Sequence, residues 1–235
     1  MPTAKQTAKA VLQKLGIFEE VRLLANKTGI HKTVPHGHQV LIDEIEALVA
    51  AGQDLKGKTC IEIGSTREDV PGQGSTARLA KLCKREGIQF ISVDMDPEQV
   101  ERASQTIAKH SPDFKAHQAK GEEFLEAFEG PYHFLYLDAF DIDHAEHSER
   151  RRSRYKEILG TDIGNEACYE MHLRCAQAAT KSMPAGGVVS FDDTWRADGR
   201  WQGKGYTALP FFEQNGFSIT RETGNTVLLV REAAH

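Results

Sequence analysis

The spacing of apolar residues divides the chain into two parts with different periodicity. In residues 1–56 apolar side chains recur at helical intervals, as at Leu41 and Ile45. That interval places them on one face of a helix. We therefore predict a helical N-terminal cap or lid over residues 1–56 and a separate domain over residues 57–235.

In the second part short apolar runs alternate with amphipathic segments. The runs that indicate strands are Thr59–Ile63, Gln89–Asp94, residues 115–119, residues 132–137, Val188–Phe191, residues 217–221 and Thr226–Arg231. The segments that indicate helices are one ending near Arg85, one opened by Asp96 and Pro97, residues 122–128, Asn165–Ser182 and one after Gly205. Parallel strands need crossover connections, so this alternation predicts a doubly wound, mostly parallel α/β sheet of seven strands. The last two strands, around Gly224 and Asn225, predict an antiparallel C-terminal hairpin.

Composition and charge narrow the class of protein. The chain has 235 residues, of which 40% are hydrophobic and 27% charged, as is typical of a globular protein rather than a disordered or fibrous one. No apolar run approaches the roughly 20 residues of a membrane span, and the polar N-terminus lacks a signal peptide, so we expect a cytoplasmic protein without a membrane partner. The net charge of -5 argues against nucleic acid as a partner.

The cysteines show no metal-binding or disulfide pattern. All of them lie in apolar periodic segments without a CxxC or zinc spacing, and they are Cys60, Cys83, Cys168 and Cys175. We expect free, buried thiols.

Candidate ligand-binding residues lie at the ends of the predicted strands. Ligands of such sheets bind beyond the carboxyl ends of the strands, where the strand order reverses. The first strand is followed by Gly64, and a second glycine stretch beginning at Gly72 opens the next helix. Glycines allow a ligand to approach the backbone, and a helix N-terminus favours negative charge. The second strand ends at Asp94, whose carboxylate can accept the hydroxyls of a ribose.

Four stretches, IEIGS, GQGST, VDMDP and the C-terminal GFSITRETGNTVLLVRE, resemble the class I S-adenosylmethionine-dependent methyltransferases over about residues 36–231. The resemblance implies a Rossmann-like methyltransferase fold and S-adenosyl-L-methionine as cofactor. It implies that Glu62 anchors the glycine turn, that Asp94 holds the ribose and that Glu122 meets the adenine amino group. The full set of implied cofactor-binding residues is Glu62, Gly64, Ser65, Gly72, Gly74, Ser75, Asp94, Gly121, Glu122 and Asp138. Residues 66–71 are an insertion relative to the family, and Arg67 within it could reach the cofactor carboxylate.

Two further stretches, FLYLDAFDID and GGVVSFDDTW, resemble the metal-dependent small-molecule O-methyltransferases, including the catechol type and antibiotic- and sugar-modifying relatives. In this resemblance the metal ligands are Asp138, Asp192 and Asp193. Three carboxylates at adjacent strand ends would repel one another unless a cation lay among them, and oxygen ligands select Mg²⁺, Mn²⁺ or Ca²⁺. The alternative is that Asp192 or Asp193 only caps the following segment. We expect a divalent ion, Mg²⁺ first.

The same resemblance implies a mechanism in which the metal lowers the pKa of a substrate hydroxyl, in line with the cofactor methyl group. Asp138 then belongs to the catalytic residues. The catechol-type relatives carry a lysine where this chain has Asp141. Candidate bases on the loop are therefore Asp141, Asp143, His144 and His147, of which we favour His144. His36 and His38 are read as part of a polar loop.

Three functions stay open. The first is an O-methyltransferase acting on a small-molecule hydroxyl, such as that of a sugar, a phenol or a polyketide. The second is a nucleotide-cofactor oxidoreductase, which the glycine spacing fits less well. The third is a non-catalytic binding module that uses the basic run between Arg150 and Lys156 to hold a protein or an acidic ligand, although a solvated helix face or loop explains that run better. The N-terminal extension suits a lid or a homodimer contact.

Overall fold

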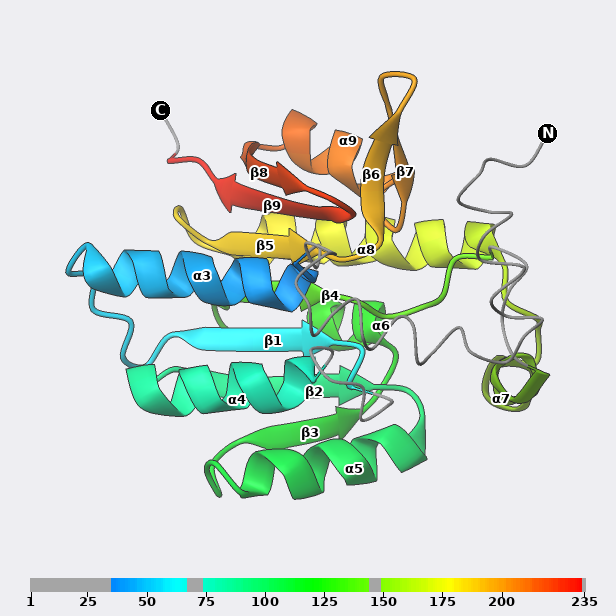
Figure 1. Cartoon of the computed structure of the whole chain (residues 1–235), viewed down its shortest axis with the longest axis horizontal. Helices are drawn as coiled ribbons and strands as arrows, with labels where there is room; N and C mark the ends of the chain where they lie inside the picture. The colour runs from blue at the N-terminus through cyan, green and yellow to red at the C-terminus, as the bar shows by residue number, and fades with distance from the viewer. Residues whose placement is uncertain (1–34, 67–73, 144–148, 234–235) are drawn as a thin grey trace, which may run out of the picture. The chain divides into compact units, whose positions relative to one another are not determined.

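The computed structural model describes residues 35–66, 74–143 and 149–233, without the side chains of Arg150 and Arg151 (Figure 1). The chain divides into two compact units, Met1–Val34 and Pro35–His235, and all described residues belong to the second. Its helices are α3 (Gly37–Ala50), α4 (Ser75–Glu86), α5 (Pro97–Ala108), α6 (Gly121–Ala127), α7 (Glu149–Leu159), α8 (Asn165–Ser182) and α9 (Ala208–Gln214). Its strands are β1 (Thr59–Ile63), β2 (Gln89–Asp94), β3 (Lys115–Gln118), β4 (Phe134–Leu137), β5 (Val188–Phe191), β6 (Thr194–Ala197), β7 (Arg200–Gly203), β8 (Phe217–Thr223) and β9 (Thr226–Arg231).

Seven of these strands form one sheet in the order β3-β2-β1-β4-β5-β9-β8. The first five are parallel to one another, whereas β9 lies antiparallel between β5 and β8. Ile63 at the end of β1 is in register with Val93 of β2 and Leu137 of β4. The residues that follow these strands therefore meet at one edge of the sheet. The structure confirms the predicted fold class, including the antiparallel hairpin.

Helices cover both faces of the sheet because side chains of a strand alternate between faces. Cys60 of β1 packs in a core with Leu41 of α3 and Leu79 of α4. Its neighbour Ile61 points to the other core, which contains Met171 of α8. In Figure 1, α3, α4 and α5 lie on one side of the sheet, and α6 and α8 on the other.

Local signals explain where helices begin and end. The side chain of Asp96 accepts a hydrogen bond from the backbone N–H of Glu98, and Pro97 occupies the first position of α5. Helix α4 ends at Gly87, whose φ of 69° is the left-handed conformation that glycine adopts without strain. Both ends agree with the sequence prediction.

The predicted cap over residues 1–56 includes α3, whose packing the structure describes. Helix α3 buries Leu41 and Ile45 completely in the core beneath the sheet, and the compact unit begins at Pro35. The apolar face of α3 needs the sheet for its burial, so this helix belongs to the α/β unit rather than to a lid. Residues 1–34 lie outside the described part of the chain.

Strands β6 and β7 were not predicted; they form a separate two-stranded hairpin directly after β5. Helix α7 lies in the polar insertion that follows β4 and contains the basic run, for which a solvated helix face or a loop was expected. The four cysteines are free and buried, as predicted. Among the described residues, no helix combines the length and apolarity needed to cross a membrane.

Candidate active site

Gly64 joins the ends of β1 and β4. Its φ is +95°, and a Cβ added there would lie 2.7 Å from the backbone nitrogen of Ala139 and 2.7 Å from the carbonyl oxygen of Asp138. Any side chain would collide with the backbone that follows β4, so only glycine fits. The close approach brings the first turn after β1 beside Asp138.

The Glu62 side chain of β1 is hydrogen-bonded to the first residues of α4. Its carboxyl is fully buried and accepts hydrogen bonds from the hydroxyls of Ser75, at 2.6 Å, Thr76, at 2.8 Å, and Ser92, at 2.6 Å. Burial raises the pKa of Glu62 to about 7, although the hydroxyl donors oppose the rise. Glu62 thus ties the first turn of α4 to β1 and β2.

Asp94 connects the loops after β1 and β2. One carboxylate oxygen accepts the backbone N–H of Ser65 at 3.0 Å, and the other accepts that of Asp96 at 2.9 Å. A carboxylate can accept about four hydrogen bonds in all, two at each oxygen. The carboxylate borders a pocket of about 280 Å³, open solvent included, whose lining residues are Asp94, Met95, Lys120, Gly121, Ala139, Phe140 and Met171.

This pocket has apolar walls and one charged acceptor at its rim. Phe140 is almost buried and has a φ of 58°, a conformation that bulky residues rarely adopt. Gly121 begins α6 so close to β1 that an added Cβ would lie 2.1 Å from Cγ2 of Ile63. Apolar walls beside a carboxylate acceptor are the chemistry that the adenine ring and the ribose hydroxyls of S-adenosylmethionine would require.

Several of the other predicted cofactor residues do not line this pocket. Glu122 is buried, which raises its pKa; its Oε1 lies 3.4 Å from Arg174, and its Oε2 has no partner among the described residues. It does not line the pocket, although Gly121 does. Gly74 and Ser75 stand at the start of α4, where an added Cβ on Gly74 would meet nothing. Gly72 and Arg67 lie outside the described residues.

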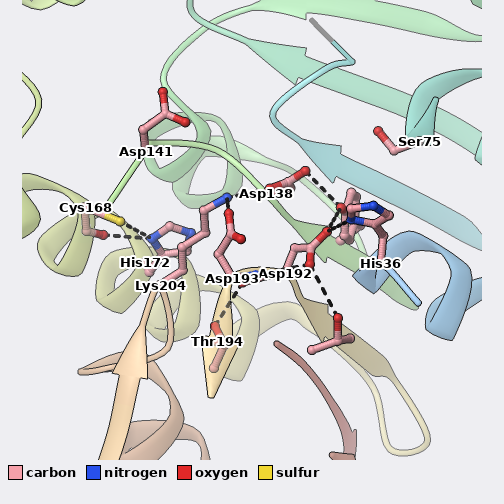
Figure 2. Close-up of polar contacts among 12 residues, drawn as sticks. His36, Ser75, Asp138, Asp141, Cys168, His172, Asp192, Asp193, Thr194 and Lys204 are labelled. Atoms are coloured by element: carbon pink, nitrogen blue, oxygen red, sulfur yellow. Dashed lines mark hydrogen bonds and ion pairs between the residues drawn. The ribbon is translucent and has the colours of Figure 1, made fainter. Parts of the chain in front are cut away.

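The second part of the site is an acidic cluster at the ends of β4 and β5, formed by Asp138, Asp192 and Asp193. Figure 2 shows the side chain of Lys204, which comes from the segment after β7, between the carboxylates of Asp138 and Asp193, whereas Asp192 lies beside His36. The Lys204 ammonium lies 2.5 Å from Asp138 Oδ1 and 3.1 Å from Asp193 Oδ2. Its side chain is only 2% exposed. Sequence reasoning predicted the cluster of acids and missed the lysine.

Lys204 stays charged in this buried position. Burial by itself would lower its pKa, but the negative charges of Asp138 and Asp193 outweigh burial and raise it. The pKa of Asp138 is raised by burial and by the two neighbouring aspartates, while Lys204 opposes the rise. A buried lysine thus pairs with two aspartates that are themselves partly exposed.

Asp192 faces a different set of partners. Tyr136 is fully buried, and its hydroxyl lies 2.9 Å from Asp138 Oδ2 and 3.1 Å from Asp192 Oδ2, so its one proton serves both carboxylates. His36 Nδ1 lies 3.3 Å from the same oxygen of Asp192. Burial opposes ionisation of Asp192, but the hydrogen bond from His36 and the charge of Lys204 lower its pKa to about 2. His36, read from the sequence as part of a polar loop, is thus a neighbour of the acidic cluster.

The structure does not support the predicted magnesium site at Asp138, Asp192 and Asp193. Asp138 and Asp193 bind the Lys204 ammonium, and Asp192 turns towards Tyr136 and His36. In residues 35–66, 74–143 and 149–233 no group of three His, Cys, Asp or Glu residues could hold a metal ion. The expected repulsion among the acids is real, but a lysine from the unpredicted hairpin supplies the cation.

The loop after β4 carries the predicted catalytic residues. Asp141 donates its backbone N–H to the hydroxyl of Tyr155 at 2.6 Å, and Figure 2 shows its side chain apart from the Lys204 cluster. His144 and His147 lie outside the described residues, so the choice of His144 as base stays a prediction.

Of the basic run on α7, the side chains of Arg152 and Arg154 are engaged within the chain. Arg154 binds both carboxylate oxygens of Asp96, at 2.9 and 2.6 Å. Arg152 pairs with Asp143 and Asp162, at 3.3 and 3.1 Å. These contacts favour a structural role of the run over a clamp for an acidic ligand.

No family model matches the chain, and no curated protein matches it. Solved structures do match. NSun6 from Pyrococcus horikoshii with SFG aligns with a TM-score of 0.54 and 14% identity, over 84% of this chain and 52% of that one. The 16S rRNA N2 G1207 methyltransferase RsmC from T. thermophilus, in complex with AdoMet and guanosine, aligns with a TM-score of 0.52 and 12% identity, over 86% of this chain and 44% of that one.

A candidate rRNA-methylase from Clostridium thermocellum aligns with a TM-score of 0.52 and 12% identity, over 85% of this chain and 98% of its own. The chain spans about half the length of NSun6 and RsmC. The metal-dependent small-molecule relatives are not among these neighbours, and the presence of rRNA methylases means that the fold does not support the exclusion of nucleic acid. Identities this low establish architecture alone: the chain has the fold of the S-adenosylmethionine-dependent methyltransferases.

Proposed function

We propose that the protein is an S-adenosylmethionine-dependent methyltransferase that methylates a hydroxyl group of a small molecule. The observation that carries this proposal is the antiparallel β9 between β5 and β8, together with the buried Asp94 at the rim of a pocket at the sheet's switch point. The dinucleotide-binding sheet of many oxidoreductases has the order 3-2-1-4-5-6, so the strand order favours the methyltransferase over the oxidoreductase.

The pocket residues would divide the cofactor between them. Asp94 would accept the ribose hydroxyls, and the backbone of Gly121 would face the adenine, with Met95 and Phe140 as apolar walls. The N-terminus of α4, which Glu62 holds in place, would present the positive end of its helix dipole to the cofactor carboxylate. When bound, S-adenosylmethionine supplies an electrophilic methyl group on its sulfonium sulfur.

Asp138 is the residue best placed to receive the methyl acceptor. It follows β4 directly, its backbone adjoins the pocket-lining Ala139, and its side chain is 32% exposed. A carboxylate there accepts a hydrogen bond from an acceptor hydroxyl and takes its proton as the methyl group is transferred. Lys204 and Tyr136 hold this carboxylate from behind.

The chemistry of Asp138 selects among the acceptors considered from the sequence. A carboxylate is a weak base, and without a metal ion it cannot substantially ionise an alcohol of the sugar type. A phenolic hydroxyl has a pKa of about 10 and already loses its proton far more easily. We therefore favour a phenol over a sugar or an aliphatic polyketide hydroxyl.

Calorimetry with the cofactor and a transfer assay test the proposal. We expect S-adenosylmethionine to bind with one site per chain, whereas NAD⁺ and NADH do not bind. We expect labelled methyl groups to appear on members of a phenol panel and not on sugars. Asp138→Asn should abolish transfer while leaving cofactor affinity within about twofold, and Asp198→Asn on the exposed hairpin should change neither.

Three results would overturn the proposal in different ways. Binding of a nicotinamide cofactor instead of S-adenosylmethionine would favour the oxidoreductase. Transfer to RNA and not to phenols would keep the methyltransferase and replace the acceptor class, as the structural neighbours allow. Cofactor binding without transfer to any acceptor would favour a binding module.

A further inference from the structure

Lys204 occupies the place where a metal ion was expected. Its ammonium bridges Asp138, which follows β4, and Asp193, which follows β5, at 2.5 and 3.1 Å. A side chain that is 2% exposed cannot swing out into solvent without opening the hairpin above it. The cation is therefore part of the folded core rather than a mobile surface lysine.

The backbone around Lys204 is shaped to deliver it to the acids. Gly203 has a φ of +75°, and an added Cβ would lie 1.9 Å from the carbonyl oxygen of Asp193. Gly205 is similarly confined, with Cγ2 of Thr194 at 2.6 Å from its added Cβ. The backbone N–H of Lys204 donates to the carbonyl of Asp193 at 3.0 Å. The segment that carries Lys204 can pass this close to the turn after β5 because Gly203 and Gly205 have no side chains. This close approach places the Lys204 side chain next to the acidic cluster.

The turn opposite Lys204 is also held in an uncommon conformation. Asp193 has a φ of 44°, and its neighbour Asp192 accepts the backbone N–H of Asp193 at 3.1 Å. Non-glycine residues persist in the left-handed region only when their surroundings enforce it. The contact with Lys204 is one such constraint, because it fixes the position of the Asp193 carboxylate.

A second buried basic side chain near Lys204 stays neutral. His172 is fully buried, and burial, with the charge of Lys204, lowers its pKa to about 3. Its Nδ1 donates to the carbonyl of Cys168 at 2.8 Å, and its Nε2 has no partner among the described residues. Figure 2 shows the imidazole beside the lysine. His172 therefore adds no positive charge. Of these two buried basic side chains, Lys204 is the one that carries a positive charge to the acidic cluster.

We propose that the Lys204 ammonium takes the place of a divalent metal ion in the acidic cluster. It neutralises Asp138 and Asp193 and fixes the positions of their carboxylates. Lys204 is a positioning residue, since it acts through Asp138. A Mg²⁺ ion needs oxygens at about 2.0–2.1 Å in octahedral array, and the ammonium already occupies the space between these carboxylates. The catalytic consequence rests on the proposed function, but the cation site itself does not.

Removal of the lysine should turn the cluster into a metal site. We would titrate Mn²⁺ into the full chain without cofactor and follow the free ion by electron paramagnetic resonance. The wild type and Lys84→Ala, an exposed lysine of α4, should show no tight site, whereas Lys204→Ala should bind one Mn²⁺ at least tenfold more tightly. The double variant Lys204→Ala with Asp138→Asn should lose the gained site. Mn²⁺ should also raise the melting temperature of Lys204→Ala and not that of the wild type.

Each outcome decides the proposal. A tight Mn²⁺ site in the wild type that disappears in Asp138→Asn would overturn it, as would a folded Lys204→Ala that gains no affinity. If Lys204→Ala does not fold, Lys204→Met fills the same space without the charge, and the wild-type titration still decides. Failure to find any methyl acceptor would end the proposed function and leave the Mn²⁺ result unaffected.

Discussion

Three carboxyl groups, two of them buried and one partly exposed, position the loops of this site. Glu62, Asp94 and Asp138 each stand at or beside the end of a parallel strand, and each has several hydrogen-bond partners. Their roles differ because their partners differ: hydroxyls surround Glu62, backbone N–H groups hold Asp94, and a lysine faces Asp138. A carboxyl group alone in the sequence does not reveal which of these partners it will meet.

Glu62 predicts a pH dependence of stability. Its pKa is about 7 in the folded chain against an ordinary value of 4.5, so the folded state holds the proton more tightly than the unfolded state. The free energy of unfolding should therefore fall as the pH rises from about 4.5 to 7 and then level off, with a contribution of up to about 3 kcal/mol. Urea unfolding at a series of pH values measures it.

Glu62→Gln removes the titration and should flatten this part of the profile. The exposed Glu129→Gln is the matched control and should keep the wild-type slope. An unchanged slope in Glu62→Gln would show that other groups cause the dependence.

Asp94 predicts a loss of cofactor affinity. Asp94→Asn keeps the size of the side chain but removes the charge that would strengthen the ribose hydrogen bonds. Each such bond contributes about 1.5–3 kcal/mol, so S-adenosylmethionine should bind at least tenfold more weakly in calorimetry. Equal affinity of variant and wild type would remove Asp94 from the cofactor site.

At the scale of elements, the β6–β7 hairpin determines which cation neutralises the acidic cluster. It leaves the sheet after β5, returns through Gly203 and brings Lys204 beneath Asp138. Helix α7 has a comparable structural role on the cofactor side, because Arg154 ties the insertion to Asp96 at the start of α5. Both elements lie in segments whose sequence pattern is irregular.

Two glycines of the hairpin provide a matched pair of substitutions. Gly203 and Gly199 both have positive φ, of 75° and 72°, but only Gly203 has a neighbour within reach of an added Cβ. Both alanine variants carry the strain of the left-handed conformation, of roughly 1–2 kcal/mol. Gly203→Ala should lose about 1–3 kcal/mol more than Gly199→Ala through the collision with Asp193. Equal losses in chemical denaturation would show that the crossing is not tight in solution.

At the scale of the whole molecule, the pocket connects segments that are far apart in the sequence. It is lined from β2, α6, the segment after β4 and α8, so a ligand there bridges both halves of the sheet. A ligand that binds only the folded state stabilises it by about 2.7 kcal/mol at 100 times its dissociation constant. Thermal unfolding with S-adenosylmethionine at that ratio should therefore show a melting temperature higher by roughly 5–10 °C.

Asp94→Asn should lose most of this increase at the same ligand concentration, and NAD⁺ should give none. An equal increase with NAD⁺ would contradict the methyltransferase proposal. The measurement needs no methyl acceptor, so it tests the cofactor site separately from the reaction.

The sequence by itself determined the α/β architecture, because strand and helix periodicities, the Asp96 and Pro97 start of α5 and the Gly87 end of α4 are local signals. It also placed Gly64, Asp94, Asp138 and Asp192 at one edge, since parallel strands end together. Two things were decided only by tertiary structure. Helix α3 joined the sheet because its apolar face is buried there, and Lys204 reached the acids through a hairpin with no repeating apolar pattern. Lys204 is twelve positions from Asp192, and no sequence spacing indicates that the two lie near each other. The close approach of the backbone at Gly203 brings the Lys204 charge to the carboxylates.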